Sequence, residues 1–368
     1  MREIRRRIFF VTVILLAIGV VMIYSASGVF AYERLHDSAY YLKRHLFYLF
    51  LGMFVFYFFL QWDYSLLRKY SRLLIMISFL LLIAVLIPGI GQSIGGARRW
   101  FKFGIFSFQP SELAKFSLLV YTADFFVRKK NLIKSNFYNL IPLMLVTFLM
   151  AGIILIQPDM GTAFLVGVIL LIFMIVFGVG LRCIFNLILI SLPILFIAIF
   201  STPYRRKRIL AFLDPWADPR GTGFQIVQSL VAFGSGGILG RGLGQSRQKL
   251  LYLPAAHTDF IFSILGEELG LLGALLVIIL FGILFWEAFK IPFRIQDEFG
   301  QFLSLGIISI LAIQVLVNIG VTVGVLPTKG LPLPFISYGG SALIFNLAYV
   351  ALLLNIAREK KRIRWKEY

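Results

Sequence analysis

The stretch Phe260-Ile-Phe-Ser-Ile-Leu-Gly-Glu-Glu-Leu-Gly-Leu-Leu-Gly-Ala-Leu-Leu-Val-Ile-Ile-Leu-Phe-Gly-Ile-Leu-Phe-Trp286 is an almost unbroken apolar run in which only Glu267 and Glu268 are charged. A helix needs about 20 apolar residues to cross the hydrocarbon core of a bilayer, and this run is long enough. A helix also satisfies its backbone hydrogen bonds without water. The run therefore predicts a transmembrane helix.

The rest of the chain has the same character. Of its 368 residues, 60% are hydrophobic and 14% are charged, whereas an average globular protein has about 25% charged residues. We expect an all-α polytopic membrane protein with about ten transmembrane helices. The apolar runs that predict these spans are Ile8–Tyr24, Leu46–Leu60, Leu73–Pro88, Leu113–Val127, Tyr138–Ile156, Thr162–Phe177, Cys183–Phe200, Phe260–Trp286, Phe302–Val325 and Ala342–Ala357.

The distribution of basic residues sets the expected orientation. Lys and Arg are enriched in cytoplasmic segments, and placing both termini in the cytoplasm gives a modest basic excess on that side. We expect a single membrane domain over residues 1–368, with a large extracytoplasmic loop at 201–258 and a basic cytoplasmic tail at 358–368. Within the loop, Tyr204–Leu213 leads from basic into apolar residues and predicts an interfacial helix.

The net charge of +19 narrows the choice of partners. Most basic residues flank apolar runs, which favours membrane lipids or a phosphorylated substrate over nucleic acid. The single cysteine, Cys183, excludes an intramolecular disulfide and a cysteine-based zinc site.

Two polar motifs lie in the first half of the chain. In Gln109-Pro-Ser-Glu-Leu-Ala-Lys115, Glu112 and Lys115 are three residues apart and share a helical face, either as a structural ion pair or to engage an anionic headgroup. In Gln157-Pro-Asp-Met-Gly-Thr162, Asp159 occupies a tight turn, where capping of the next helix is the alternative to a functional role.

The densest polar cluster is Ala256-His-Thr-Asp-Phe260. Asp259 begins a helix, so it is either an N-cap or a general base toward a sugar hydroxyl, with His257 to orient it. Glu267 and Glu268 are adjacent and point to different helix faces, so at least one needs an internal partner.

The irregular segment Leu326–Ser341 is rich in proline and glycine. Non-helical backbone near membrane depth is tolerated where it lines a cavity or is buried in protein. This segment is therefore either a rigid turn or a cavity wall that presents Lys329, Ser337 and Ser341.

These segments, in this order, resemble the SEDS (shape, elongation, division and sporulation) family of bacterial cell-wall proteins. The resemblance covers nearly the whole chain and favours the division members over the rod-shape members, because Gly242–Pro254 matches their pattern and Ala256 precedes His-Thr-Asp. The motifs that carry it are Gly96-Ala-Arg-Arg-Trp100, Gln109–Lys115, Gln157–Thr162, Ala256-His-Thr-Asp-Phe-Ile-Phe262 with Gly266-Glu-Glu-Leu-Gly270, and Pro334-Phe-Ile-Ser-Tyr-Gly-Gly-Ser341.

The resemblance implies a glycosyltransferase that polymerises lipid II into β-1,4 glycan on the outer face of the bacterial cytoplasmic membrane, during septal cell division. It implies that Asp259 is essential, and that Arg99, Glu112, Lys115 and Asp159 are functional. The implied partners are a class B penicillin-binding protein, which is a transpeptidase, and other division proteins.

Two alternatives to this enzyme remain from the sequence: a flippase that transports lipid II, and a non-catalytic division scaffold. The resemblance names no certain cofactor. A divalent cation such as Mg²⁺ or Mn²⁺ could share the pyrophosphate charge, although the sequence offers no dedicated metal cage.

Overall fold

The computed structural model describes residues 1–94, 96–135, 137–200, 202–250, 253–254 and 256–358. The expected tail at 358–368 therefore lies outside the described residues except for Arg358. Each of the ten predicted spans falls on a helix. These helices are α1 (Arg2–Leu35), α2 (Tyr40–Gln61), α4 (Ser71–Ala84), α5 (Pro110–Ser135), α6 (Ile141–Ile156), α7 (Met160–Val176), α8 (Leu181–Phe200), α11 (Ile261–Phe289), α12 (Glu298–Thr322) and α13 (Gly340–Ile356).

The helices differ in how clearly they qualify as spans. Among the described residues, five stretches are long and apolar enough to cross a membrane, namely α1, α2, Tyr138–Ile156, α11 and α12. Shorter apolar helices occur at Ser71–Ala84, Met160–Val176, Leu181–Pro193 and Gly340–Ile356. The remaining helix, α5, includes Glu112, Lys115 and Asp124, and these charges are buried against other helices. The fold is thus that of a polytopic helical membrane protein.

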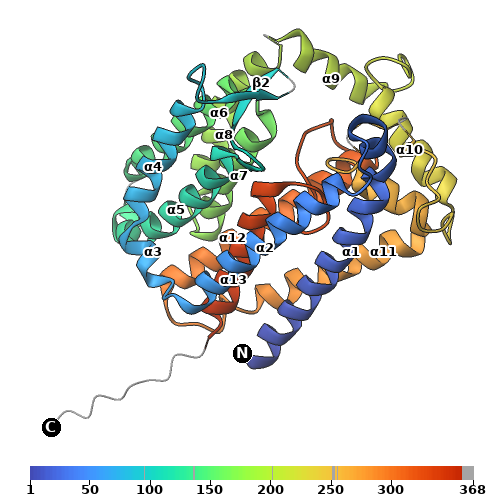
Figure 1. Ribbon diagram of the computed structural model, residues 1–368. Coiled ribbons are helices and arrows are strands. Elements are labelled where there is room, and N and C mark those ends of the chain that lie inside the picture. Colours follow the sequence, from blue (N-terminus) through green and yellow to red (C-terminus); the bar gives the residue numbers. More distant parts are fainter. Residues whose placement is uncertain (95, 136, 201, 251–252, 255, 359–368) are drawn as a thin grey trace.

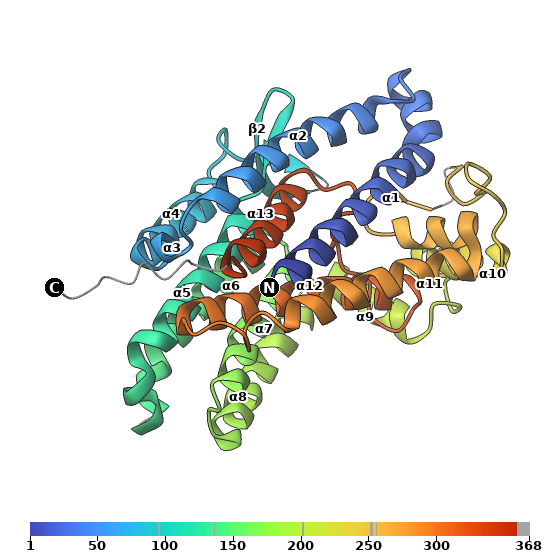
Figure 2. The ribbon, with the colours of Figure 1, turned by 90° about the horizontal axis from the view of Figure 1, so that it is seen from below.

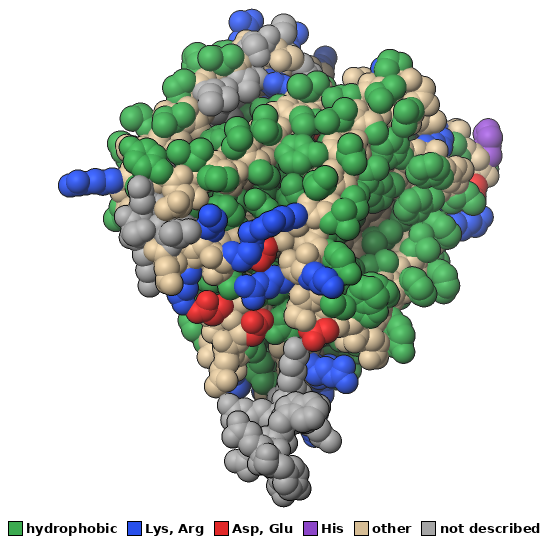
Figure 3. All heavy atoms as spheres, turned by 90° about the vertical axis from the view of Figure 1, so that its left-hand side faces the viewer, with side chains coloured by type: hydrophobic (Ala, Val, Ile, Leu, Met, Phe, Trp, Pro, Cys, Tyr) green, Lys and Arg blue, Asp and Glu red, His purple; other side chains and the backbone are tan. Residues whose placement is uncertain are grey.

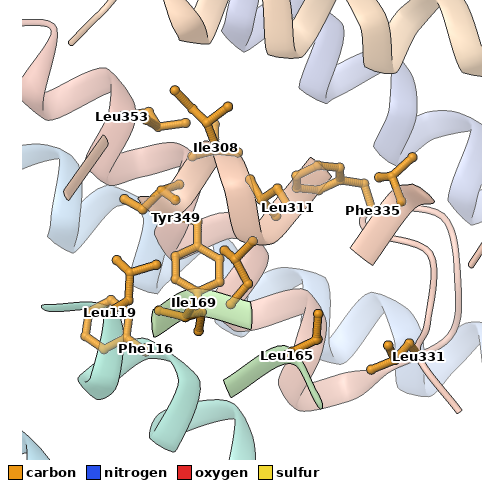
Figure 4. Packing of buried hydrophobic residues seen from close by; sticks show 14 of the residues in the cluster. Phe116, Leu119, Leu165, Ile169, Ile308, Leu311, Leu331, Phe335, Tyr349 and Leu353 are labelled. Atoms are coloured by element: carbon orange, nitrogen blue, oxygen red, sulfur yellow. The ribbon is translucent and has the colours of Figure 1, made fainter. Parts of the chain in front are cut away.

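The helices pack around α12 and α13. In Figure 2, α13 lies along α2, and α1 crosses α11. Figure 4 shows Phe116 and Leu119 of α5, Ile169 of α7 and Tyr349 of α13 meeting in one apolar cluster. The outward faces are apolar too, as Figure 3 shows for one side of the molecule. Apolar surface on both the inside and the outside is what a bilayer requires.

One end of the bundle carries a small sheet, and we call it the β2 end (Figure 1). A three-stranded antiparallel sheet forms there from β1 (Gln92–Ile94), β2 (Ala97–Phe103) and β3 (Phe106–Phe108), with Phe101 opposite Phe108. The sequence did not predict this sheet. The N-terminus lies at the opposite end, which also carries α3 (Ser65–Lys69) and which we call the α3 end (Figure 1).

The predicted loop at 201–258 contains two helices, α9 (Pro203–Leu213) and α10 (Phe224–Gly236). The helix predicted at Tyr204–Leu213 is confirmed as α9. Helix α10 packs on α11 and buries Ile226, Val227 and Ala232. The loop is therefore folded, with α9 near the β2 end and α10 beside α11 (Figure 1). A short 3-10 helix at Phe137–Leu140 precedes α6.

Candidate active site

A cavity of about 520 Å³ opens at the β2 end. Its walls come from six separate parts of the chain: β2, the residue before α5, the end of α6 with the turn before α7, α9 with the residue before it, the segment before α11, and the loop between α12 and α13 with the start of α13. Four residues predicted from the sequence meet there, namely Arg99, Asp159, Asp259 and Lys329. The lining also includes Arg205, Arg208 and Tyr338.

Asp259 is held by its backbone just before α11 begins at Ile261. The side-chain amide of Asn318 on α12 donates to the Asp259 carbonyl (2.9 Å) and to the Leu331 carbonyl (2.8 Å). Asn318 is itself buried, so these bonds are made away from water. They tie Asp259 to the loop that carries Lys329 and fix two cavity walls relative to each other.

The Asp259 carboxyl is more basic than an ordinary aspartate. Burial raises its pKa to about 6, while the positive charges of Arg208 and Arg99 oppose this rise and Asp159 adds to it. A carboxylate with such a pKa is ionised at neutral pH yet accepts a proton readily. These are the properties of a general base.

The pKa of Asp259 predicts a pH dependence for activity. A base works only when deprotonated, so activity should fall as the pH drops through about 6. Arg208→Gln removes a charge that lowers this pKa, so the acid limb should move to higher pH. The measurement is the pH profile of polymer formation by wild type, Arg208→Gln and, as a control, Arg220→Gln, whose side chain is exposed. A limb at the same pH in all three proteins would contradict this assignment.

The cavity holds more cations than carboxylates. Arg99, Arg205, Arg208 and Lys329 face it, against Asp159 and Asp259. Arg205 donates to the Leu155 carbonyl (3.1 Å) and Arg208 to the Thr328 carbonyl (3.3 Å), so backbone contacts position both guanidinium groups. Such an arrangement suits a ligand with several negative charges.

Lys329 and Asp159 have defined surroundings. The Lys329 Nζ lies 3.8 Å from the centroid of the Phe164 ring, and burial lowers its pKa to about 8. Asp159 caps α7 by accepting from the Thr162 N–H (3.1 Å), and its Oδ2 lies 3.8 Å from Arg99 Nη1. Asp159 is thus both a helix cap and a member of the cavity wall, so the two sequence hypotheses for it are compatible.

Glu112 and Lys115 form the predicted ion pair on the first turns of α5. Lys115 Nζ lies 2.8 Å from Glu112 Oε1, and both side chains are buried. Neither residue is among the described residues that line the cavity. The pair lies in the protein interior, on the helix that follows β3.

The other three predicted site residues, His257, Ser337 and Ser341, are not among the described residues that line the cavity, and their side chains instead make contacts within the protein. Ser341 Oγ donates to the Ser107 carbonyl (3.1 Å), and Ser337 Oγ accepts from the Leu333 N–H (2.9 Å). The His257 ring packs beside Tyr41 and Tyr338, with ring centroids 4.4 and 5.8 Å away. Burial lowers the pKa of His257 to about 4, so it is neutral at physiological pH.

Both glutamates of α11 have internal partners, where the sequence required at least one. Glu268 pairs with Lys249 (2.8 Å) and accepts from Ser25. Glu267 accepts from the Ser246 hydroxyl and from the Arg247 and Gln248 N–H groups. These contacts dock the segment before Asp259 onto α11.

Sequence reasoning missed three cavity residues: Arg205, Arg208 and Tyr338. The basic run in α9 is a visible signal for the two arginines, because basic residues of the extracytoplasmic loop fit the pyrophosphate of the implied substrate, but the sequence does not single out which of them reach the site. As for metals, the part of the chain that the structure describes contains no group of three or more His, Cys, Asp or Glu residues able to hold an ion. Asp159 and Asp259 alone do not make a dedicated metal site.

Comparison with known sequences covers almost the entire chain. The family model for FtsW, RodA and SpoVE, described as cell cycle protein, matches residues 5–362. A probable peptidoglycan glycosyltransferase FtsW from Geobacter metallireducens is 44% identical over 354 residues, which are 96% of this chain and 94% of that protein. Stage V sporulation protein E of Bacillus subtilis is 44% identical over 348 residues, which are 95% of each chain.

Solved structures share the fold over the same length. A chain from a peptidoglycan synthase complex that coordinates polymerization and crosslinking matches with a TM-score of 0.77 and 32% identity, covering 96% of this chain and 98% of that one. The crystal structure of the rod shape determining protein RodA from Thermus thermophilus matches with a TM-score of 0.70 and 28% identity, covering 96% and 97%.

Proposed function

The chain belongs to the FtsW/RodA/SpoVE family of cell cycle proteins, and we propose that it is a peptidoglycan glycosyltransferase that polymerises lipid II into β-1,4 glycan outside the cytoplasmic membrane. One observation of the site supports this most directly: a carboxyl with a raised pKa, Asp259, shares a cavity with an excess of cations. A sugar hydroxyl needs a base, and a departing pyrophosphate needs positive charge.

In the proposed reaction, Asp259 and the cations of the cavity have different roles. Asp259 accepts the proton of the acceptor sugar's hydroxyl while that oxygen attacks the anomeric carbon of the donor. The bond between the anomeric carbon and the pyrophosphate oxygen breaks, and the electron pair leaves with the pyrophosphate. Arg99, Arg208 and Lys329 hold the pyrophosphate and stabilise its growing charge.

We propose the same cavity as the site of lipid II, and a class B penicillin-binding protein as the transpeptidase partner. The structural neighbour from a complex that joins polymerization to crosslinking supports such a partner. We further propose that the protein works at the division septum. Relatives with a division name and with a sporulation name are equally identical to this chain, so the location of a fluorescent fusion in dividing and sporulating cells tests that role.

The effect of replacing Arg99 on polymer formation should distinguish the enzyme hypothesis from the transporter hypothesis. With purified protein in detergent, lipid II is already accessible and no flipping step exists. Arg99→Ala should lower polymer formation by about 10- to 100-fold, because a positioned cation is lost from the leaving group. The measurement is glycan formed with the partner present and its penicillin site blocked.

The neighbouring residue supplies the matched control for that assay. Arg98 lies beside Arg99 on β2, but its side chain is exposed and lies outside the cavity lining. Arg98→Ala should therefore retain wild-type activity. If wild type with its partner makes no polymer, or if wild type, Arg99→Ala and Asp259→Asn make equal amounts, the transporter hypothesis becomes the better one.

A further inference from the structure

A second polar cavity lies at the α3 end, far from the candidate active site. It is open, measures about 410 Å³ and is formed by α3, the start of α4 and the second half of α5. Its lining contains four cations and one carboxylate. These residues are Ser65, Arg68, Lys69, Ser71, Arg72, Asp124 and Arg128.

Asp124 is buried at this cavity and holds three of its side chains by hydrogen bonds. It is 3% exposed and accepts hydrogen bonds from the Ser71 hydroxyl (2.6 Å), from Arg68 Nε (3.3 Å) and from Arg128 Nε (2.9 Å). Both guanidinium groups meet Asp124 through Nε, so their Nη groups remain for another acceptor. One carboxylate cannot balance four cations, and the cavity keeps three positive charges in excess.

An apolar stripe begins where the cavity ends. Helix α4 exposes Leu73, Met76, Ile77 and Leu80, whose spacing places them on one helical face directly after Arg72. Figure 3, which views the molecule from the side of α3, α4 and α5, shows Lys and Arg side chains gathered below a broad apolar surface. A ligand here would meet cations at one end and hydrocarbon-like surface at the other.

We propose that this cavity binds the phosphate group of an anionic membrane phospholipid, with the acyl chains along the α4 stripe. The distribution of basic residues assigns the α3 end to the cytoplasm, so the ligand belongs to the inner leaflet. Anionic headgroups gain about 1 kcal/mol for each nearby Lys or Arg. A soluble phosphate offers the same chemistry but makes no use of the stripe. The proposal is independent of the catalytic activity.

Binding of defined lipids to the purified full-length protein in detergent tests the site. Native mass spectrometry would follow titration with dioleoyl phosphatidylglycerol, dioleoyl phosphatidylethanolamine or inorganic phosphate. We expect wild type to prefer phosphatidylglycerol. Lys69→Gln/Arg72→Gln should weaken that binding by about 10- to 30-fold, because two of the four cations are lost. Both side chains are exposed and form no ion pair in the described structure, so the variant should fold.

The control variant, Arg6→Gln/Arg182→Gln, removes two exposed cations near the same membrane face but outside this cavity. It should bind phosphatidylglycerol as wild type does. Equal binding by wild type and Lys69→Gln/Arg72→Gln, or equal binding of the two lipids by wild type, would overturn the proposal. Binding of inorganic phosphate without phosphatidylglycerol, weakened by the same substitutions, would keep the phosphate cavity and overturn the lipid as its ligand.

Discussion

Replacing Asp259 by Asn is expected to lower glycan polymerisation by about 10²- to 10⁴-fold while the protein still folds. Asn has nearly the same size and retains a side-chain carbonyl, but it cannot accept a proton at neutral pH. The contacts that position this residue come from its backbone carbonyl, which Asn318 binds, so they survive the substitution. The loss should therefore appear in the chemical step, measured as polymer formed per folded protein.

A carboxylate outside the cavity provides the control. Asp218 lies between α9 and α10, is exposed, and accepts from the Thr222 N–H (2.7 Å). Asp218→Asn removes one negative charge from the same end of the molecule and should leave polymerisation close to wild type. Near-normal synthesis by Asp259→Asn, or equal losses in both variants, would remove Asp259 from the role of base.

The spans could be predicted because they depend on a property of local sequence. A run of apolar residues has to avoid water wherever the rest of the chain goes, and all ten runs fall on helices. The sheet at Gln92–Phe108 depends on pairing between very short strands. Two of its strands have only three residues, too few for an alternating pattern to emerge, and the seven residues of β2 do not alternate strictly between apolar and polar.

Individual site residues could be predicted from the sequence, but their arrangement in space could not. Asp259, Arg99 and Lys329 were identified from motifs, yet nothing in the sequence placed them in one cavity. The position of α9 beside the cavity could not be predicted either, because it depends on tertiary contacts. Arg208 reaches the cavity because α9 folds back over the β2 end and bonds to Thr328, a contact between distant parts of the chain.

Glu267 and Glu268 also show what the sequence can and cannot predict. A charge inside a span had to have a partner, so the sequence demanded one for Glu267 or Glu268. The partners, Lys249 and the backbone after Ser246, belong to Gly242–Pro254, a segment whose position in the fold the sequence does not indicate. The need for a partner could be predicted locally, whereas its identity is set by tertiary structure.

Breaking the ion pair of Glu112 and Lys115 should have the second-largest effect, this time on stability. Lys115 is 1% exposed and its Nζ lies 2.8 Å from Glu112 Oε1. Glu112→Gln or Lys115→Met alone leaves one charge buried without its partner, which costs about 3–5 kcal/mol. The double variant buries no charge at this position. Its loss of stability should therefore be several kcal/mol smaller than the sum of the two single losses.

An exposed ion pair between the same helix, α5, and α12 is the control for this cycle. Lys130 bonds to Glu298, and their side chains are 39% and 41% exposed, so solvent screens the interaction. The cycle of Glu298→Gln and Lys130→Met should give a coupling of about 1 kcal/mol or less. Thermal unfolding in detergent measures both cycles under one condition.

Additive losses for Glu112 and Lys115 would mean that other groups stabilise each charge. Lys115 would then be free to act on an anionic ligand. Strong coupling would instead show that the pair is structural. If either residue left its partner to bind substrate, the other would remain as an isolated buried charge, which is unfavourable.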